Sequence, residues 1–97
     1  MDVLPEILEF EWDLGNKNKC FLKHGVTVQE AEEVFVNEPL LVAEDSYHSE
    51  SESRYQALGK TGNGRLLFVS FTLRKEKIRI ISARVMSRKE TRIYEKT

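Results

Sequence analysis

Apolar residues recur at every second position in some parts of the chain and at helical spacing in others. Residues 66–69 are apolar on both faces, which is typical of a strand in the middle of a sheet. Residues 8–12 alternate apolar and acidic side chains and predict a short first strand. The other expected strands are residues 40–43, 54–60, 65–73 and 77–85, and helices are expected over 13–23, between Thr27 and Asn37, and after Ser87.

Two segments carry the signature of a capping box, in which a Ser or Thr before a helix and a Glu three residues later satisfy each other's backbone amides. Thr27 and Glu30 predict the start of the second helix. Ser87 and Glu90 predict the start of the last one. Gly25 follows the first expected helix, where a left-handed backbone conformation favours glycine.

The last three expected strands are joined by short connections. Residues 61–64 include two glycines and an asparagine, which tolerate positive φ, and residues 74–76 form the next turn. Short connections favour antiparallel neighbours, so residues 54–85 are expected to form a meander. Two helices and a short strand before the meander, and one helix after it, predict a single α+β domain over residues 1–97.

The composition is that of an ordinary small domain. A chain of 97 residues with 40% apolar residues can bury one core without a disulfide or metal. The single cysteine, Cys20, excludes an internal disulfide and suits a reducing compartment. No signal peptide and no apolar run of about 18 residues is found, so a cytoplasmic protein without a membrane partner is expected.

The charges are unevenly distributed along the chain. Residues 1–53 hold thirteen acids and three lysines, a net charge of −10, whereas residues 54–97 hold twelve Lys or Arg and three acids, a net charge of +9. Such a split favours a basic surface that meets an anionic partner. The alternative is that the two halves interleave in the fold and their charges pair on the surface.

Metal and cofactor chemistry is not expected. His24 and His48 are the only histidines and Cys20 is the only thiol, so the ligand set of a structural zinc site is missing. The glycines at 59, 62 and 64 fall in an expected hairpin rather than between a strand and a helix, so they do not form a phosphate-binding loop.

Several separated blocks of sequence resemble one known family. In chain order they are Phe10-Glu11-Trp12-Asp13, Lys23-His24-Gly25-Val26, Glu30-Ala31-Glu32-Glu33-Val34-Phe35, Ile78-Arg79-Ile80-Ile81-Ser82-Ala83-Arg84, Ser87-Arg88-Lys89-Glu90 and Tyr94. Together they resemble the BrnT family, the toxin half of a type II toxin–antitoxin pair in bacteria. The resemblance runs from Phe10 to Tyr94, nearly the whole chain.

The resemblance implies a fold, an activity and partners. The implied fold is RelE-like, an antiparallel β-sheet with two N-terminal helices and one C-terminal helix. The implied activity is a ribonuclease that cleaves RNA and inhibits translation. The implied partner is a BrnA-like antitoxin with a ribbon-helix-helix DNA-binding part, so that the toxin reaches operator DNA only through the antitoxin.

Ribonuclease chemistry without a metal requires a group that accepts the proton of the attacking 2′-hydroxyl, a group that protonates the leaving oxygen, and cations beside the phosphorane. Histidine or lysine can exchange protons, while arginine supplies fixed charge and paired donors. The candidate catalytic residues are Lys23, His24, Arg54 and Arg84. For Lys23 and His24 the alternative is a helix C-terminus, where cations are favoured by the helix dipole.

The candidate RNA-binding residues are His48, Arg65, Arg79 and Arg88. For His48 the alternative is a hydrogen bond within an irregular loop, and for each arginine it is a surface salt bridge. Arg54 and Arg65 start neighbouring strands, so both are expected near the same rim of the sheet. Arg79 and Arg84 are expected on opposite faces of a regular strand, because their separation is odd.

Two rival functions remain open at this point. One is a module without catalytic activity that grips RNA or an antitoxin through its basic second half. The other is an inactive scaffold that acts only as a co-repressor with the antitoxin. Growth arrest and transcript degradation on expression distinguish an active nuclease from both.

Overall fold

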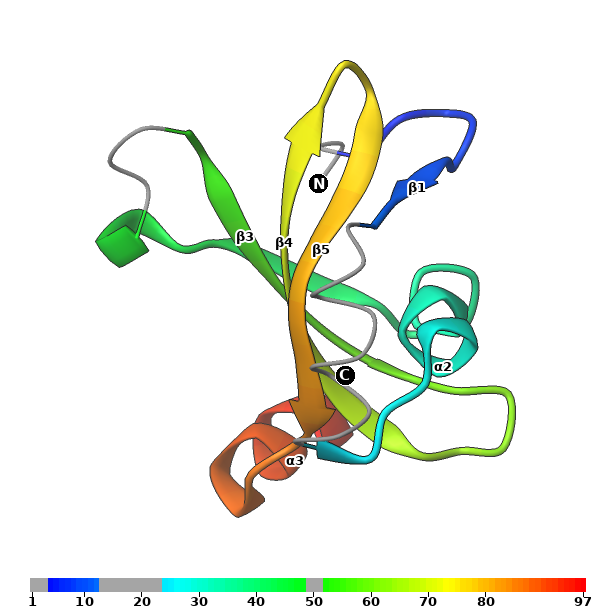
Figure 1. The fold of residues 1–97 in the computed structure, drawn as a ribbon. Helices are drawn as coiled ribbons and strands as arrows, with labels where there is room; N and C mark the ends of the chain where they lie inside the picture. Colours follow the sequence, from blue (N-terminus) through cyan, green and yellow to red (C-terminus); the bar gives the residue numbers. More distant parts are fainter. Residues whose placement is uncertain (1–3, 13–23, 49–51) are drawn as a thin grey trace.

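The computed structural model describes residues 4–12, 24–48 and 52–97. Five strands form one sheet in the order β1-β5-β4-β3-β2 (Figure 1). The elements are β1 (Phe10–Glu11), α2 (Val28–Glu33), β2 (Leu41–Glu44), the 3-10 turn η1 (Ser46–His48), β3 (Arg54–Lys60), β4 (Leu66–Arg74), β5 (Lys77–Val85) and α3 (Arg88–Glu95). No helix in this part of the chain is long and apolar enough to cross a membrane.

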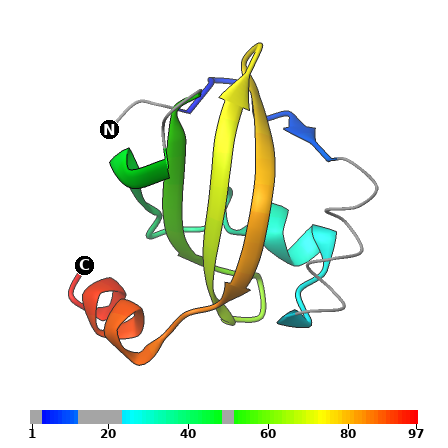
Figure 2. The ribbon, with the colours of Figure 1, turned by 60° about the vertical axis from the view of Figure 1, so that its left-hand side comes forward.

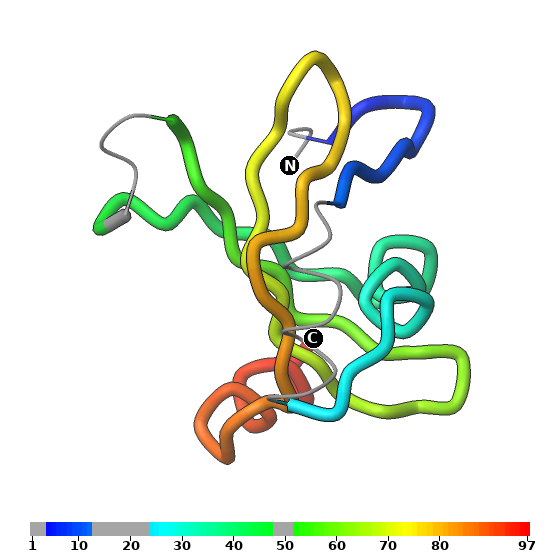
Figure 3. The backbone as a smooth tube through the Cα atoms, in the orientation of Figure 1, coloured from blue at the N-terminus to red at the C-terminus, as the bar shows by residue number. Residues whose placement is uncertain are grey.

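The sheet is mixed, so the expectation of an antiparallel sheet is wrong. β1 pairs in parallel with β5, and Phe10 lies opposite Ile78. Figure 3 shows these two segments, from opposite ends of the sequence, side by side. The alternation of side chains identifies a strand but does not give its direction. Only a short turn gives the direction, and none connects β1 to β5.

The expectation of two N-terminal helices is also wrong for the part of the chain that the structure describes. It contains one helix before the meander, α2, and one after it, α3. The first expected helix, over 13–23, lies outside the described residues. α2 is six residues long and ends at Glu33, several residues before the predicted end at Asn37.

Both predicted capping boxes are present. Thr27 Oγ1 accepts from the Glu30 amide at 3.1 Å, and the Thr27 amide donates to Glu30 Oε1 at 3.0 Å. The same two bonds join Ser87 and Glu90, at 3.2 and 2.8 Å. The predicted starts of these two helices are therefore confirmed.

The predicted meander is also confirmed. β3 and β5 have the expected bounds, and β4 lies between them in the middle of the sheet. Both pairings in the meander are antiparallel, so Arg54 lies opposite Thr72 and Lys60 opposite Leu66. Consequently, the starts of β3 and β4 lie at opposite ends of the sheet.

A register shift in β5 changes which side chains share a face. Ser70 pairs with Ser82, but Phe71 pairs with Ile80, so Ile81 is an extra residue in β5. Alternation restarts after this bulge, which keeps Ala83 in the core with Ile80. Arg79 and Arg84 therefore project from the same face, and the expectation of opposite faces, which assumed a regular strand, is wrong.

The two faces of the sheet have different covers. One face forms the core with α2 and the residues that follow it, through the buried residues Ala31, Val34, Phe35, Ala57, Leu67, Val69, Phe71, Ile78, Ile80 and Ala83. The Phe35 ring meets the Phe71 ring edge-on at 5.1 Å. We call the opposite face the outer face; it carries Glu11, Leu41, Ala43, Arg54, Gln56, Leu58, Phe68, Ser70, Thr72, Arg79, Ser82 and Arg84. α3 packs against the outer face at the end where β5 leads into it (Figure 2).

Gly59 allows the chain after α2 to approach β3 closely. A Cβ at this position would lie 2.6 Å from Val34 Cγ1 and 3.2 Å from the Val34 carbonyl oxygen. Val34 is fully buried, so its short branched side chain has little room to move. We expect Gly59→Ala to lower the free energy of unfolding by about 1–3 kcal/mol, measured by urea denaturation.

Gly62→Ala is the matched control for this prediction. The nearest atoms to its Cβ would be those of the Glu33 carboxylate, at 3.6 Å or more, which is ordinary contact. We expect a change within about 0.5 kcal/mol for this exposed turn position. Equal urea midpoints for the two variants would show that the contact between Gly59 and Val34 is not tight.

Candidate functional site

The outer face brings together polar and cationic side chains in rows across the strands. Arg54, Thr72 and Arg79 lie side by side at one end of the face. Gln56, Ser70 and Ser82 form the next row toward α3. The third row is Leu58, Phe68 and Arg84, beside α3. The face thus places a polar row between two rows that each contain a guanidinium group.

Arg84 is fixed by an ion pair with α3. Its Nη1 and Nη2 donate to the two carboxylate oxygens of Glu90 at 2.8 and 2.9 Å, and Nη1 also donates to the Val85 carbonyl at 3.2 Å. The guanidinium carbon lies 4.1 Å from the centre of the Phe68 ring. These contacts hold one positive charge at the end of β5, with 38% of the side chain exposed.

The pair with Glu90 keeps both groups charged. The hydrogen bond from Arg84 lowers the pKa of the Glu90 carboxyl, and the Ser87 amide lowers it further, against the effect of burial. The bond to Glu90 in turn raises the pKa of Arg84. Glu90 is therefore an anion that caps α3 and orients Arg84 at the same time.

Arg65 makes the equivalent contact with α2. Its Nη1 lies 3.0 Å from Glu30 Oε2, the glutamate of the other capping box, and donates to the Gly25 carbonyl at 2.9 Å. The pKa of Glu30 is lowered, first by the Thr27 amide and then by Arg65. The N-termini of α2 and α3 are thus tied through their capping glutamates to Arg65, just before β4, and to Arg84 of β5.

Three of the predicted site residues gather at one end of the sheet. His24 directly precedes Gly25, which contacts Arg65, and Arg65 directly precedes β4. Met86, just after β5, donates its amide to the Leu66 carbonyl at 3.1 Å, so Arg84 lies at the same end. Figure 2 shows the chain after His24 starting at the same end of the sheet as the turn between β3 and β4. His24 itself is half-buried.

The structure separates other predicted pairs. Arg54 lies at the opposite end of the sheet from Arg65, because β3 and β4 are antiparallel, so the expectation of a shared rim is wrong. Arg88 is exposed at the first position of α3. Lys23 and the side chain of His48 lie outside the described residues.

Ion pairs join the acidic first half to the basic second half. Those within the described parts of the two halves include Lys77–Glu9, Arg79–Glu11, Arg65–Glu30 and Arg74–Glu52. For these residues the alternative interpretation therefore holds: the two halves interleave, and their charges pair on the surface. Such exposed pairs contribute little to stability, but they reduce the positive field of the outer face.

Sequence reasoning missed two features of this site. The second role of Glu90, as partner of Arg84, was hidden behind its capping signature. The outward set of Gln56, Ser70 and Ser82 was also missed, although alternation along β3 and β4 could have identified its first two members. Among residues 4–12, 24–48 and 52–97, no group of three His, Cys, Asp or Glu side chains is placed to hold a metal ion.

Comparison with known proteins identifies the family. Residues 12–90, more than half of the chain, match the family described as the ribonuclease toxin, BrnT, of type II toxin–antitoxin systems. The fold is similar to the crystal structure, at 1.1 Å resolution, of the Brucella abortus ribonuclease toxin BrnT, with a TM-score of 0.65 and 21% identity, over 84% of this chain and 100% of that chain. Comparison with curated proteins found no match. The chain therefore belongs to the BrnT family of ribonuclease toxins of type II toxin–antitoxin systems.

Proposed function

We propose that this protein cleaves RNA without a metal ion, stops translation in the cytoplasm and is neutralised by a cognate antitoxin. The observation that carries this proposal is the fixed guanidinium of Arg84 at the sheet end that also holds His24 and Arg65. Family membership supplies the substrate class, RNA. Phosphodiester cleavage by the 2′-hydroxyl requires a cation for the phosphorane and groups that exchange protons, and Arg84 and His24 are of these types.

In the proposed reaction, the 2′-hydroxyl attacks the adjacent phosphate and the 5′ oxygen leaves. Lys23 and His24 exchange the protons, one taken from the attacking hydroxyl and one given to the leaving oxygen. Arg84 stabilises the phosphorane. Its three hydrogen bonds to Glu90 and Val85 leave two of the five guanidinium N–H groups for substrate, within the described part of the chain.

The remaining candidates act on flanking nucleotides. Arg54 lies at the far end of the outer face. It is proposed to assist catalysis by binding a phosphate next to the scissile one. Arg65, Arg79, Arg88 and His48 are proposed to bind the RNA backbone. Arg65 and Arg79 have carboxylate partners on the surface, and RNA phosphates would compete with those partners for the same N–H groups.

Membership of a toxin–antitoxin family implies an antitoxin partner. We propose a BrnA-like antitoxin with a ribbon-helix-helix part, which covers the outer face and links the toxin to operator DNA. The toxin would then contact DNA only through the antitoxin. Charge steering of this encounter would make association slower as salt rises.

One observation favours a second candidate, a module that binds RNA or antitoxin and acts as co-repressor without cleavage. Arg65, Arg79 and Arg84 each have a carboxylate partner in this structure. If RNA does not displace these partners, the site binds without stabilising a transition state.

Cleavage of labelled RNA by the purified protein should continue in EDTA. The products should carry a 2′,3′-cyclic phosphate or its 3′-phosphate derivative, because the 2′-hydroxyl is the proposed nucleophile. The antitoxin should abolish this cleavage when added in equimolar amount. Loss of activity in EDTA and recovery with Mg²⁺ would refute the metal-independent mechanism.

Arg84→Ala should lower the single-turnover rate of RNA cleavage by more than about tenfold, because a donor to the phosphorane stabilises the transition state more than the bound substrate. The loss of the partly exposed pair with Glu90 should cost about 1 kcal/mol of stability at most. Thermal unfolding of the same variant checks this second expectation.

Arg74→Ala is the matched control for Arg84→Ala. Arg74 also binds one carboxylate through two nitrogens, with Nε and Nη2 at 3.0 and 3.2 Å from Glu52, but it lies at the far end of the sheet from α3. We expect its removal to leave cleavage unchanged. Equal cleavage rates for the two variants at saturating RNA would remove Arg84 from the catalytic set.

A further inference from the structure

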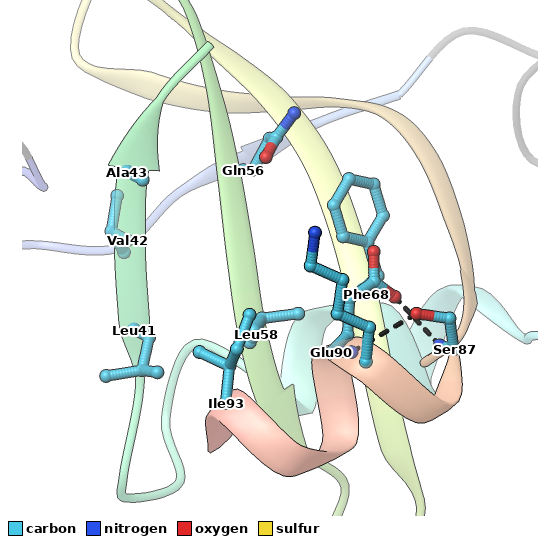
Figure 4. A pocket seen from close by; sticks show the side chains of 10 residues that line it. Leu41, Val42, Ala43, Gln56, Leu58, Phe68, Ser87, Glu90 and Ile93 are labelled. Atoms are coloured by element: carbon cyan, nitrogen blue, oxygen red, sulfur yellow. Dashed lines mark hydrogen bonds between the residues drawn. The ribbon is translucent and has the colours of Figure 1, made fainter. Parts of the chain in front are cut away.

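A groove of about 430 Å³ lies between α3 and the outer face of the sheet. The strands contribute Leu41, Val42, Ala43, Gln56, Leu58 and Phe68, and α3 with its cap contributes Ser87, Lys89, Glu90 and Ile93. Figure 4 shows Leu58 and Gln56 on β3, with the Phe68 ring on the neighbouring strand and Ile93 of α3 near Leu58. The groove is not part of the catalytic set proposed above.

The walls of the groove are mainly apolar and its polar groups are few. Leu41, Leu58 and Phe68 are only partly buried, and Ile93 remains 48% exposed. Gln56 is the exception among the strand residues. Its carboxamide has no hydrogen-bond partner among the described residues, and it is not a buried unsatisfied group, so it is open to a ligand. A carboxamide offers two donors and an acceptor.

The groove is continuous with the Arg84 position. Phe68 lines the groove and lies directly opposite Arg84 in the sheet, with the guanidinium over its ring at 4.1 Å. Glu90, which orients Arg84, also lines the groove. A nucleotide whose phosphate is held at Arg84 therefore has the groove next to it.

A nucleobase matches this combination of surfaces. It has flat apolar faces and one hydrogen-bonding edge, and proteins that recognise single-stranded RNA place such bases against apolar or aromatic side chains and read the edge with polar groups. A peptide segment is a poorer match, because a stable protein interface buries about 800 Å² on each partner. A groove of about 430 Å³ has the size of a small-ligand site rather than that of a protein interface.

We propose that this groove binds one base of the RNA next to the scissile phosphate, and that Gln56 recognises its edge. This inference rests on the proposed function. It narrows the substrate from any RNA to RNA with a particular base at one position. All four bases make the same kind of apolar contact with Leu58, Phe68 and Ile93. Gln56 hydrogen-bonds to the base edge, and this contact differs from base to base.

The test uses oligonucleotides with one ribonucleotide in a 2′-O-methyl background, which confines cleavage to one phosphate. All four bases are compared at the ribonucleotide and at its 3′ neighbour, and kcat/KM is measured for each. We expect the wild-type protein to prefer one base. Gln56→Leu should reduce the ratio between the best and the worst base by at least about fivefold, while cleavage of the worst base continues.

Gln29→Leu makes the same chemical change on the exposed side of α2, away from the groove. This control should keep the wild-type base preference. Thermal unfolding shows whether Gln56→Leu is folded, and Gln56→Glu, which keeps the shape but removes the two donors, provides a second variant. Cleavage with an unchanged base ratio in both variants would overturn the subsite and leave the ribonuclease function intact.

A binding experiment separates failure of the subsite from failure of the function. Fully 2′-O-methylated oligonucleotides cannot be cleaved by this mechanism, so fluorescence anisotropy with them reports binding alone. If the wild type cleaves nothing, the proposed function fails, but base-dependent affinity that Gln56→Leu removes would still support the subsite. Base-independent affinity would overturn it. The subsite would also be overturned if a Gln56 variant lost affinity for the antitoxin and kept the wild-type base preference, because the groove would then bind the antitoxin.

Discussion

The bulge at Ile81 is the constraint on which the arrangement of the outer face depends. β5 must keep Ile78, Ile80 and Ala83 in the core, and an uninterrupted alternation would place Ala83 on the outer face. One extra residue resolves this conflict by restarting the alternation. As a consequence, Arg84 projects from the outer face, beside the groove, instead of into the core.

The capping glutamates attach α2 and α3 to the end of the sheet. Glu30 and Glu90 each accept from an amide at a helix start and bind an arginine, Arg65 just before β4 and Arg84 of β5 respectively. An anion at a helix N-terminus is also favoured by the helix dipole. One carboxylate therefore determines where a helix begins and where it attaches, and both helices attach at the same end of the sheet.

The candidate site follows from this common end. Arg65 and Arg84 are distant from His24 in the sequence, but the pairing of β4 with β5 and the contact of Arg65 with Gly25 bring all three to the same end of the sheet. Residue types alone identified these candidates. Their grouping was not predictable, because Arg54 was expected beside Arg65 and lies at the other end of the sheet. The groove at Gln56 depends on how α3 packs, which no local pattern describes.

The sequence by itself determined the features that arise within a few residues. Both capping boxes, the bounds of β3 and β5 and the central position of β4 follow from side-chain chemistry and alternation along the chain. Only the tertiary structure decided the parallel pairing of β1, the bulge in β5 and the ion pairs between the two halves. These features join segments that are distant in sequence, and alternation shows which side chains are apolar but not which strand lies beside which, or in which direction.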